Sequence, residues 1–190
     1  MKVLPRSFYR RDTGKVAKEL LGKVLVRYWR GKRLSGRIVE VEAYFEDDPA
    51  SHAFRGETPR NKPMFEEEGR AYVYFIYGNH YCLNVVTERA GVAGAVLIRA
   101  LEPIEGIKLM QRAREVPGIE NLTNGPGKLT QAFRIGKKEN RADLVRGDLV
   151  IEEGKKEKFK IVATGRIGIT EAKSRPLRFY IYGNKFVSRS

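Results

Sequence analysis

The sequence predicts an α+β fold: a single domain, residues 1–190, with a mainly antiparallel, curved β-sheet, a protruding β-hairpin and a few packed helices. Three observations support this prediction. A length of 190 residues suits one domain with its own core. Segments with strand periodicity outnumber helical segments, and turn signals separate many of them at hairpin spacing.

The strands are predicted from the alternation of apolar and polar residues between turn signals. They cover residues 23–28, 37–44, 71–76, 81–87, 95–100, 149–152, 160–163, 166–169 and 178–182. Residues 77–80 (Tyr-Gly-Asn-His) form the turn of a hairpin between two of these strands. The polar segment 46–64, which contains three prolines, is predicted to be a long loop.

Three helices are expected. Asp12 is placed to cap a helix over 13–21, which ends before Gly22. Pro103 suits the first position of a helix that continues to about residue 114. The segment Gly-Pro-Gly-Lys at 125–128 opens a third helix, which reaches about residue 133.

The charge of the chain indicates its class of partner. It contains 37 Lys and Arg against 23 Asp and Glu, a net charge of +14. This excess is typical of proteins that bind DNA, RNA or anionic lipid, although a generally basic or thermophile-like surface also accounts for it. Residues 1–37 carry +10 and residues 155–190 carry +8, so the middle of the chain carries −4. This distribution favours an enzyme that grips an anion with its ends and has its chemistry in the acidic middle.

Composition also excludes several classes of protein. The single cysteine, Cys82, excludes an internal disulfide and a zinc site built from cysteines, and it fits a reducing compartment. No stretch approaches the ~18 apolar residues of a membrane span, and the N-terminus lacks the apolar core of a signal peptide. We therefore expect an intracellular protein, cytoplasmic or associated with the nucleoid (nuclear in a eukaryote), without a membrane partner.

The predicted strand 37–44 holds the first candidate catalytic group. Its period of two places Glu40, Glu42 and Tyr44 on one face, where the chain leaves the sheet for the long loop. The functional interpretation is a general base, Glu42, beside an aromatic wall, Tyr44. The alternative is an ordinary solvated face of the sheet.

Aromatic residues are concentrated in the predicted hairpin. Tyr72 and Tyr74 share a strand face, and Tyr77 lies in the turn beside Gly78. A bulky ring on a tight turn has little to pack against in its own sheet, and it suits insertion between base pairs. The alternative is a set of tyrosines in a half-buried sheet.

Metal and phosphate motifs are incomplete. The two histidines, His52 and His80, form no spaced metal set, and the acidic runs 46–48 and 66–68 are typical of solvated loops. Residues 124–130 do not complete a P-loop, because Leu129 follows Lys128 where Ser or Thr is required, although a helix start with Lys128 can hold one backbone phosphate. We therefore expect no metal and no cofactor.

Taken in order, several segments together are far more specific than any one motif. They are 21–27 (LGKVLVR), 36–44 (GRIVEVEAY), His52, 58–61 (TPRN), 72–78 (YVYFIYG), Asn84, 97–103 (LIRALEP), 125–129 (GPGKL) and 175–180 (RPLRFY). In this order and over nearly the whole chain, they resemble the alkyladenine DNA glycosylase family (3-methyladenine DNA glycosylase, mammalian type).

The resemblance implies a role for each matching residue. Glu42 would be the general base that activates water, and Arg99 would help to position that water. The walls that stack on a flipped base would be Tyr44, His52 and Tyr74. Asn84 would be the gate that disfavours normal guanine. Tyr77 would intercalate into the DNA. Candidate water or phosphate contacts are Ile169, Lys128, Thr58 and Arg60.

The function implied is that of a monofunctional DNA glycosylase of base excision repair, formed by one domain over residues 1–190. It would flip alkylated or deaminated purines out of double-stranded DNA and hydrolyse the N-glycosidic bond, leaving an abasic site. One pocket and one wedge suffice for a monomer. The loop 170–174 is shorter than in mammalian members, and Asn79 and His80 depart from their pattern.

Two alternatives from other classes stay open at this stage. One is a non-catalytic nucleic-acid-binding module that uses the tyrosines as a stacking sheet. The other is a metal-dependent nuclease built on Glu40, Glu42 and Asp47 or Asp48.

Overall fold

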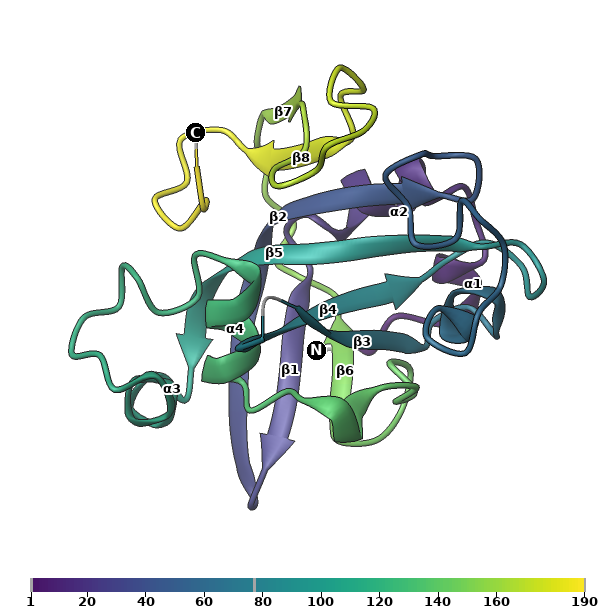
Figure 1. The fold of residues 1–190 in the computed structure, drawn as a ribbon. Coiled ribbons are helices and arrows are strands. Elements are labelled where there is room, and N and C mark those ends of the chain that lie inside the picture. Colours follow the sequence, from purple (N-terminus) through teal and green to yellow (C-terminus); the bar gives the residue numbers. More distant parts are fainter. Residues whose placement is uncertain (1, 77, 190) are drawn as a thin grey trace.

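In a computed structural model that describes residues 2–76 and 78–189, eight strands form one antiparallel sheet (Figure 1). The strands are β1 (Val24–Trp29), β2 (Lys32–Phe45), β3 (Ala71–Ile76), β4 (His80–Val86), β5 (Gly94–Glu105), β6 (Leu149–Glu152), β7 (Ile161–Thr164) and β8 (Arg178–Ile181). Their order is β3-β4-β5-β2-β1-β6, and β8 joins β2 with β7 outside it. The sheet curls, and the predicted α+β class is confirmed.

The long strand β2 organises the sheet. It pairs with β5 along nearly its whole length, while its other edge pairs first with β1 and then with β8. The turn between β1 and β2 consists of Arg30 and Gly31, both at positive φ (48° and 70°), which is the two-residue hairpin geometry that matches strand twist. This tight turn explains why β2 begins at Lys32, five residues earlier than predicted.

The buried apolar residues of the α-helices pack into the main hydrophobic core with those of the sheet. The helices are α1 (Arg6–Tyr9), α2 (Thr13–Leu20), α3 (Ile107–Arg114) and α4 (Pro126–Ala132), with short 3-10 helices at Lys62–Phe65 and Lys137–Glu139. Asp12 caps α2 as predicted, accepting a hydrogen bond from the Lys15 amide at 2.8 Å. Helix α4 lies so close to β4 that a Cβ on Gly127 would come within 2.7 Å of the His80 ring.

One predicted helix begins later than expected, and one predicted strand is a loop. The helix predicted from Pro103 begins only at Ile107, because Pro103 lies in β5 beside a register shift, where its missing N–H is tolerated, and Gly106 at φ 76° starts the helix. Residues 166–169 form a loop rather than a strand. Gly168 has φ 76° there, a conformation that a strand does not accommodate.

The predicted hairpin is formed by β3 and β4, with Ala71 opposite Val85 and Ile76 opposite His80. The proposed intercalating residue, Tyr77, lies outside the described residues. In the described part of the chain, no helix is both long and apolar enough to cross a membrane.

Truncation of a buried core side chain should lower the free energy of unfolding. Leu83 on β4 is fully buried in the main hydrophobic cluster, so Leu83→Ala should lower the free energy of unfolding by about 2–5 kcal/mol. Chemical denaturation measures this change. Ile161→Ala, at a position 38% exposed, is the control and should cost far less; equal losses for the two variants would contradict the assigned core.

Candidate active site

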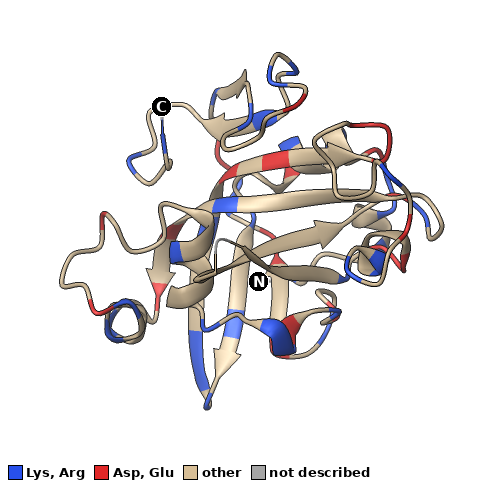
Figure 2. Cartoon of the chain, in the orientation of Figure 1, with Lys and Arg blue, Asp and Glu red and all other residues tan. Residues whose placement is uncertain are grey.

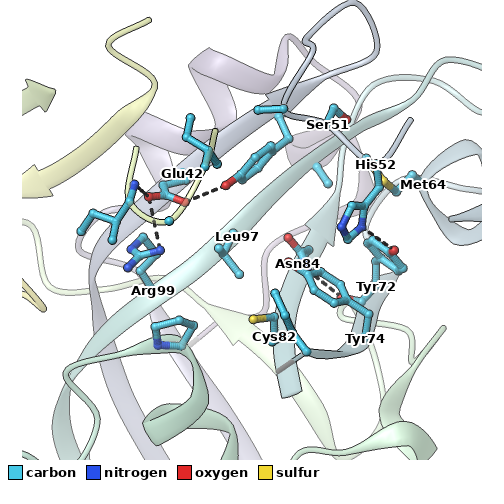
Figure 3. Close-up of a pocket in the computed structure, with 18 of the residues that line it drawn as sticks. Glu42, Ser51, His52, Met64, Tyr72, Tyr74, Cys82, Asn84, Leu97 and Arg99 are labelled. Carbon is cyan, nitrogen blue, oxygen red and sulfur yellow. Dashed lines mark hydrogen bonds and ion pairs between the residues drawn. The ribbon is translucent and has the colours of Figure 1, made fainter. Parts of the chain in front are cut away.

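One cavity of about 490 Å³ opens on the polar side of the β2–β5 pair (Figure 3). This volume lies within the ~300–1,000 Å³ that small-molecule sites usually have. Its lining comes from β2, β3, β4, β5, the loop after β2 with its 3-10 helix, the start of α4 and the loop after β7. Glu42 and Arg99 lie on one side of it, and His52, Tyr72 and Tyr74 lie on the other.

Glu42 is fully buried and is held by two hydrogen bonds and one ion pair. The Tyr44 hydroxyl donates to its Oε2 at 2.8 Å, and the backbone N–H of Ile167 donates to its Oε1 at 2.8 Å. The Arg99 guanidinium lies 3.3 Å from Oε1. Burial and the neighbouring Glu42 carboxylate raise the pKa of Tyr44, so this phenol stays neutral and donates. The carboxylate is thus fixed in orientation at the cavity wall.

Arg99 is also buried, with its side chain 8% exposed. Burial acts to lower the pKa of Arg99, but the Glu42 and Glu40 carboxylates outweigh it and raise the pKa. The guanidinium therefore remains charged beside Glu42, where it can hold both the carboxylate and a polar group in the cavity.

The opposite wall is aromatic. The His52 and Tyr74 ring centroids are 4.6 Å apart, and those of Tyr72 and Tyr74 are 5.2 Å apart. His52 Nδ1 and the Tyr72 hydroxyl are hydrogen-bonded at 2.9 Å. Burial, followed by the charge of Arg60, lowers the pKa of His52, and burial raises the pKa of Tyr72 to about 12. These rings present neutral faces suited to stacking on a planar ligand.

Asn84 and Cys82 line the cavity from β4. The Asn84 amide donates from Nδ2 to the Tyr72 carbonyl at 3.1 Å, which fixes its orientation at the cavity wall. Burial raises the pKa of the Cys82 thiol, so this cysteine behaves as a small apolar group.

Sequence reasoning named Ile169 but missed its neighbours Arg166 and Ile167, which support the Glu42 side of the cavity. Arg166 is buried in an ion pair with Asp48, donates to the Ala43 carbonyl at 3.0 Å, and lies 4.6 Å from the centre of the Tyr44 ring. Asp48 is fully buried, so the expected solvated loop at 46–48 is wrong for this residue. The alternation of polar and apolar residues in 166–169 predicts a strand, a pattern in which an arginine usually faces solvent. It therefore gave no sign that Arg166 is buried against Asp48.

The predicted site residues divide into two groups. The cavity brings together Glu42, Arg99, Tyr44, His52, Tyr74, Asn84 and Ile169. Lys128, Thr58 and Arg60 do not line it, although the Arg60 guanidinium lies 5.6 Å from the Tyr74 ring centre. Among residues 2–76 and 78–189, no three His, Cys, Asp or Glu side chains are grouped so that they could hold a metal ion.

Comparisons with known proteins match nearly the whole chain. The family described as methylpurine-DNA glycosylase (MPG) matches residues 7–185. A protein of Carboxydothermus hydrogenoformans named "Putative 3-methyladenine DNA glycosylase" is 51% identical over 189 residues, which cover 98% of this chain and 99% of that protein. A protein of the same name from Methanoculleus marisnigri is 50% identical over 190 residues, 98% of each chain. Another, from Francisella tularensis, is 48% identical over 177 residues, 91% of this chain and 92% of that protein.

The lowered pKa of His52 predicts a pH dependence of stability. In the folded chain His52 stays neutral below its ordinary pKa of 6.5, whereas the unfolded chain takes up a proton there. The free energy of unfolding is therefore unaffected by His52 protonation above pH 6.5. It decreases as the pH falls from there towards the folded-state pKa of His52. His52→Asn should flatten the fall in unfolding free energy between about pH 7.5 and about pH 5.5, measured by chemical denaturation. Equal slopes for the two proteins would contradict a buried neutral His52.

Proposed function

Because this chain belongs to the methylpurine-DNA glycosylase family, we propose that it flips alkylated or deaminated purines out of duplex DNA into the cavity between Glu42 and Tyr74. The chain is a DNA N-glycosylase, a hydrolase. Water attacks the sugar, the damaged base leaves, and an abasic site remains in an uncut strand.

One observation carries the proposal: an oriented carboxylate and a wall of aromatic rings face each other across one cavity. A flipped base needs flat neutral surfaces on which to stack, and its glycosidic bond needs a water molecule held by a base. A stacking module without catalysis accounts for the rings but gives no role to Glu42. A metal-dependent nuclease needs a group of metal ligands, and the described residues offer no such group.

The reaction requires one bond to form and one to break. The water oxygen bonds to C1′ of the deoxyribose, and the bond from C1′ to the purine nitrogen breaks. The purine leaves with that electron pair, and Glu42 accepts the proton that the water loses. Arg99 holds Glu42 and the water in place, with help from a backbone carbonyl near Ile169. For an alkylated purine, alkylation makes the base a better leaving group, so the attack needs only the positioned carboxylate.

The aromatic wall supports selection of damaged bases. Poorly paired bases cost less to flip, which favours lesions before any chemistry occurs. A cationic alkylated purine gains attraction to the Tyr44 and Tyr74 ring faces, and a neutral His52 does not repel it. Asn84 would disfavour the exocyclic amino group of normal guanine.

The remaining parts of the proposal concern the duplex. Tyr77 would fill the gap that the flipped base leaves. The hairpin of β3 and β4, to whose turn the sequence assigns Tyr77, also supplies residues of the aromatic wall. Lys128, Thr58 and Arg60 would contact phosphates or water near the cavity. The net charge of +14 would attract the polyanion, and the chain would act as a monomer in the cellular compartment that holds DNA.

Glu42→Gln tests the mechanism directly. The amide keeps the shape of the side chain but cannot accept the proton from water. Release of free methylated purine from methylated duplex DNA should therefore fall by at least about 100-fold, while duplex binding is kept. Chromatography of released bases and a gel-shift titration measure the two effects.

Glu105→Gln is the matched control, because Glu105 is a half-exposed carboxylate paired with Arg33 on the same sheet, away from the cavity. It should leave base release unchanged. A chelator should also leave the wild-type rate unchanged. Base release that survives Glu42→Gln would overturn the proposed mechanism, and loss of activity with chelator would favour the nuclease.

The product distinguishes a monofunctional enzyme from a lyase. Water, rather than an amine of the protein, is the proposed nucleophile, so the product strand should break only after treatment with alkali. Denaturing gels of end-labelled duplex, with and without alkali, measure this. Strand breaks without alkali would contradict a monofunctional glycosylase.

A further inference from the structure

Glu40 is a buried carboxylate to which the proposed reaction gives no role. It lies on β2 two residues before Glu42, its side chain is fully buried, and it does not line the cavity. Burying a charge costs free energy unless close partners offset the cost. The partners of Glu40 therefore indicate what the residue does.

Four donors occupy both oxygens of Glu40. Its Oε1 accepts from Arg99 Nε at 3.0 Å, from Arg178 Nε at 2.7 Å and from the Ser188 hydroxyl at 2.9 Å. Its Oε2 accepts from the Ser188 backbone N–H at 2.6 Å. Glu40 thus joins the cavity residue Arg99 to β8 and to the segment 184–189.

A paired irregularity in the sheet brings these charges together. Ile38 pairs with Leu101, Glu40 with Ala100 and Val41 with Ile98. Val39 in β2 and Arg99 in β5 are therefore bulged residues without a partner in this strand pairing. Such bulges redirect side chains beside active sites. Figure 2 shows the acidic stretch of β2 between basic positions on β5 and β8.

Glu40 decides how Arg99 meets Glu42. A guanidinium is a planar fork that readily binds both oxygens of one carboxylate. Glu40 accepts a hydrogen bond from Nε of Arg99, while Nη1 of the same guanidinium lies 3.3 Å from Oε1 of Glu42. The guanidinium is thereby shared between two carboxylates rather than paired with both oxygens of Glu42. Glu42 is held in place and can still accept a proton from water.

We propose that Glu40 is a positioning residue for the reaction, which acts through Arg99, and that residues 184–189 complete its binding site. Arg178 supports this segment, because it donates both to Glu40 and to the Arg189 carbonyl. The Asn184 amide ties its start to Glu102 at 2.9 Å. The inference rests on the proposed function, since it assigns Glu40 to the same site.

Glu40→Gln is the first test, measured under single-turnover conditions on methylated duplex. The excision rate should fall by about 10- to 100-fold, as expected when a catalytic group is misplaced. The dissociation constant for a duplex with an abasic site should stay within about twofold, since Glu40 does not line the cavity. Glu152→Gln is the matched control, because Glu152 is also a buried carboxylate paired with an arginine, Arg33, but lies away from the cavity. It should lower the melting temperature without slowing excision.

A double-mutant cycle separates positioning from simple destabilisation. If Glu40 acts through Arg99, Glu40→Gln should slow excision little further in an Arg99→Ala background. Two effects that multiply would overturn the inference, and so would a wild-type rate for Glu40→Gln while Glu42→Gln is inactive. Excision that survives Glu42→Gln overturns the proposed function instead, so the two failures are distinguishable.

Ser188 keeps the test decisive if Glu40→Gln does not fold. Ser188→Ala removes one hydroxyl at the edge of the network and should slow excision about threefold, because one modest hydrogen bond to Glu40 is lost. Ser188→Thr keeps the hydroxyl and should restore the rate. A wild-type rate for Ser188→Ala would remove the segment 184–189 from the proposal, and equal slowing in both variants would contradict a role for the hydroxyl.

Discussion

The antiparallel pairing of β2 with β5 is the constraint from which the rest of the site follows. It sets Glu42 opposite Leu97 and, through the compensating irregularities at Val39 and Arg99, turns one guanidinium towards two carboxylates. A slip of one residue would turn Glu40 and Glu42 to the other face, where apolar residues pack, and would leave both charges without partners. The register of the sheet and the chemistry of the cavity are therefore fixed together.

The two walls of the cavity are built differently. The Glu42 wall lies on long central strands, which hold a reacting group more firmly than a loop does. The aromatic wall combines the β3–β4 hairpin with the loop that carries His52. Buried Asn61 organises that loop by donating to the His52 and Gly56 carbonyls, at 2.7 Å and 2.9 Å, and by accepting from the Thr58 amide at 2.6 Å. These hydrogen bonds hold the long polar loop after β2 in one conformation, so that it can position the His52 ring in the aromatic wall.

The electrostatics of the surface and of the site are separate. Glu40, Glu42, Arg99 and Arg178 form a buried cluster in which positive and negative charges balance. The excess of +14 belongs to the chain as a whole, where it favours contact with a polyanion at long range. Binding can therefore vary with salt while the buried cluster is little screened.

The sequence by itself determined the α+β class, most strands, the capped helix α2 and the shared face of Glu40, Glu42 and Tyr44. The strands and the shared face follow from period-two alternation, and the helix start follows from the capping chemistry of Asp12, so each depends on local sequence alone. Only the tertiary structure decided that the Ile167 N–H supports Glu42, that Asp48 is buried against Arg166, and that Ser188 binds Glu40. These partners lie more than a hundred residues apart, and which buried donor meets which buried carboxylate depends on packing that no local pattern contains.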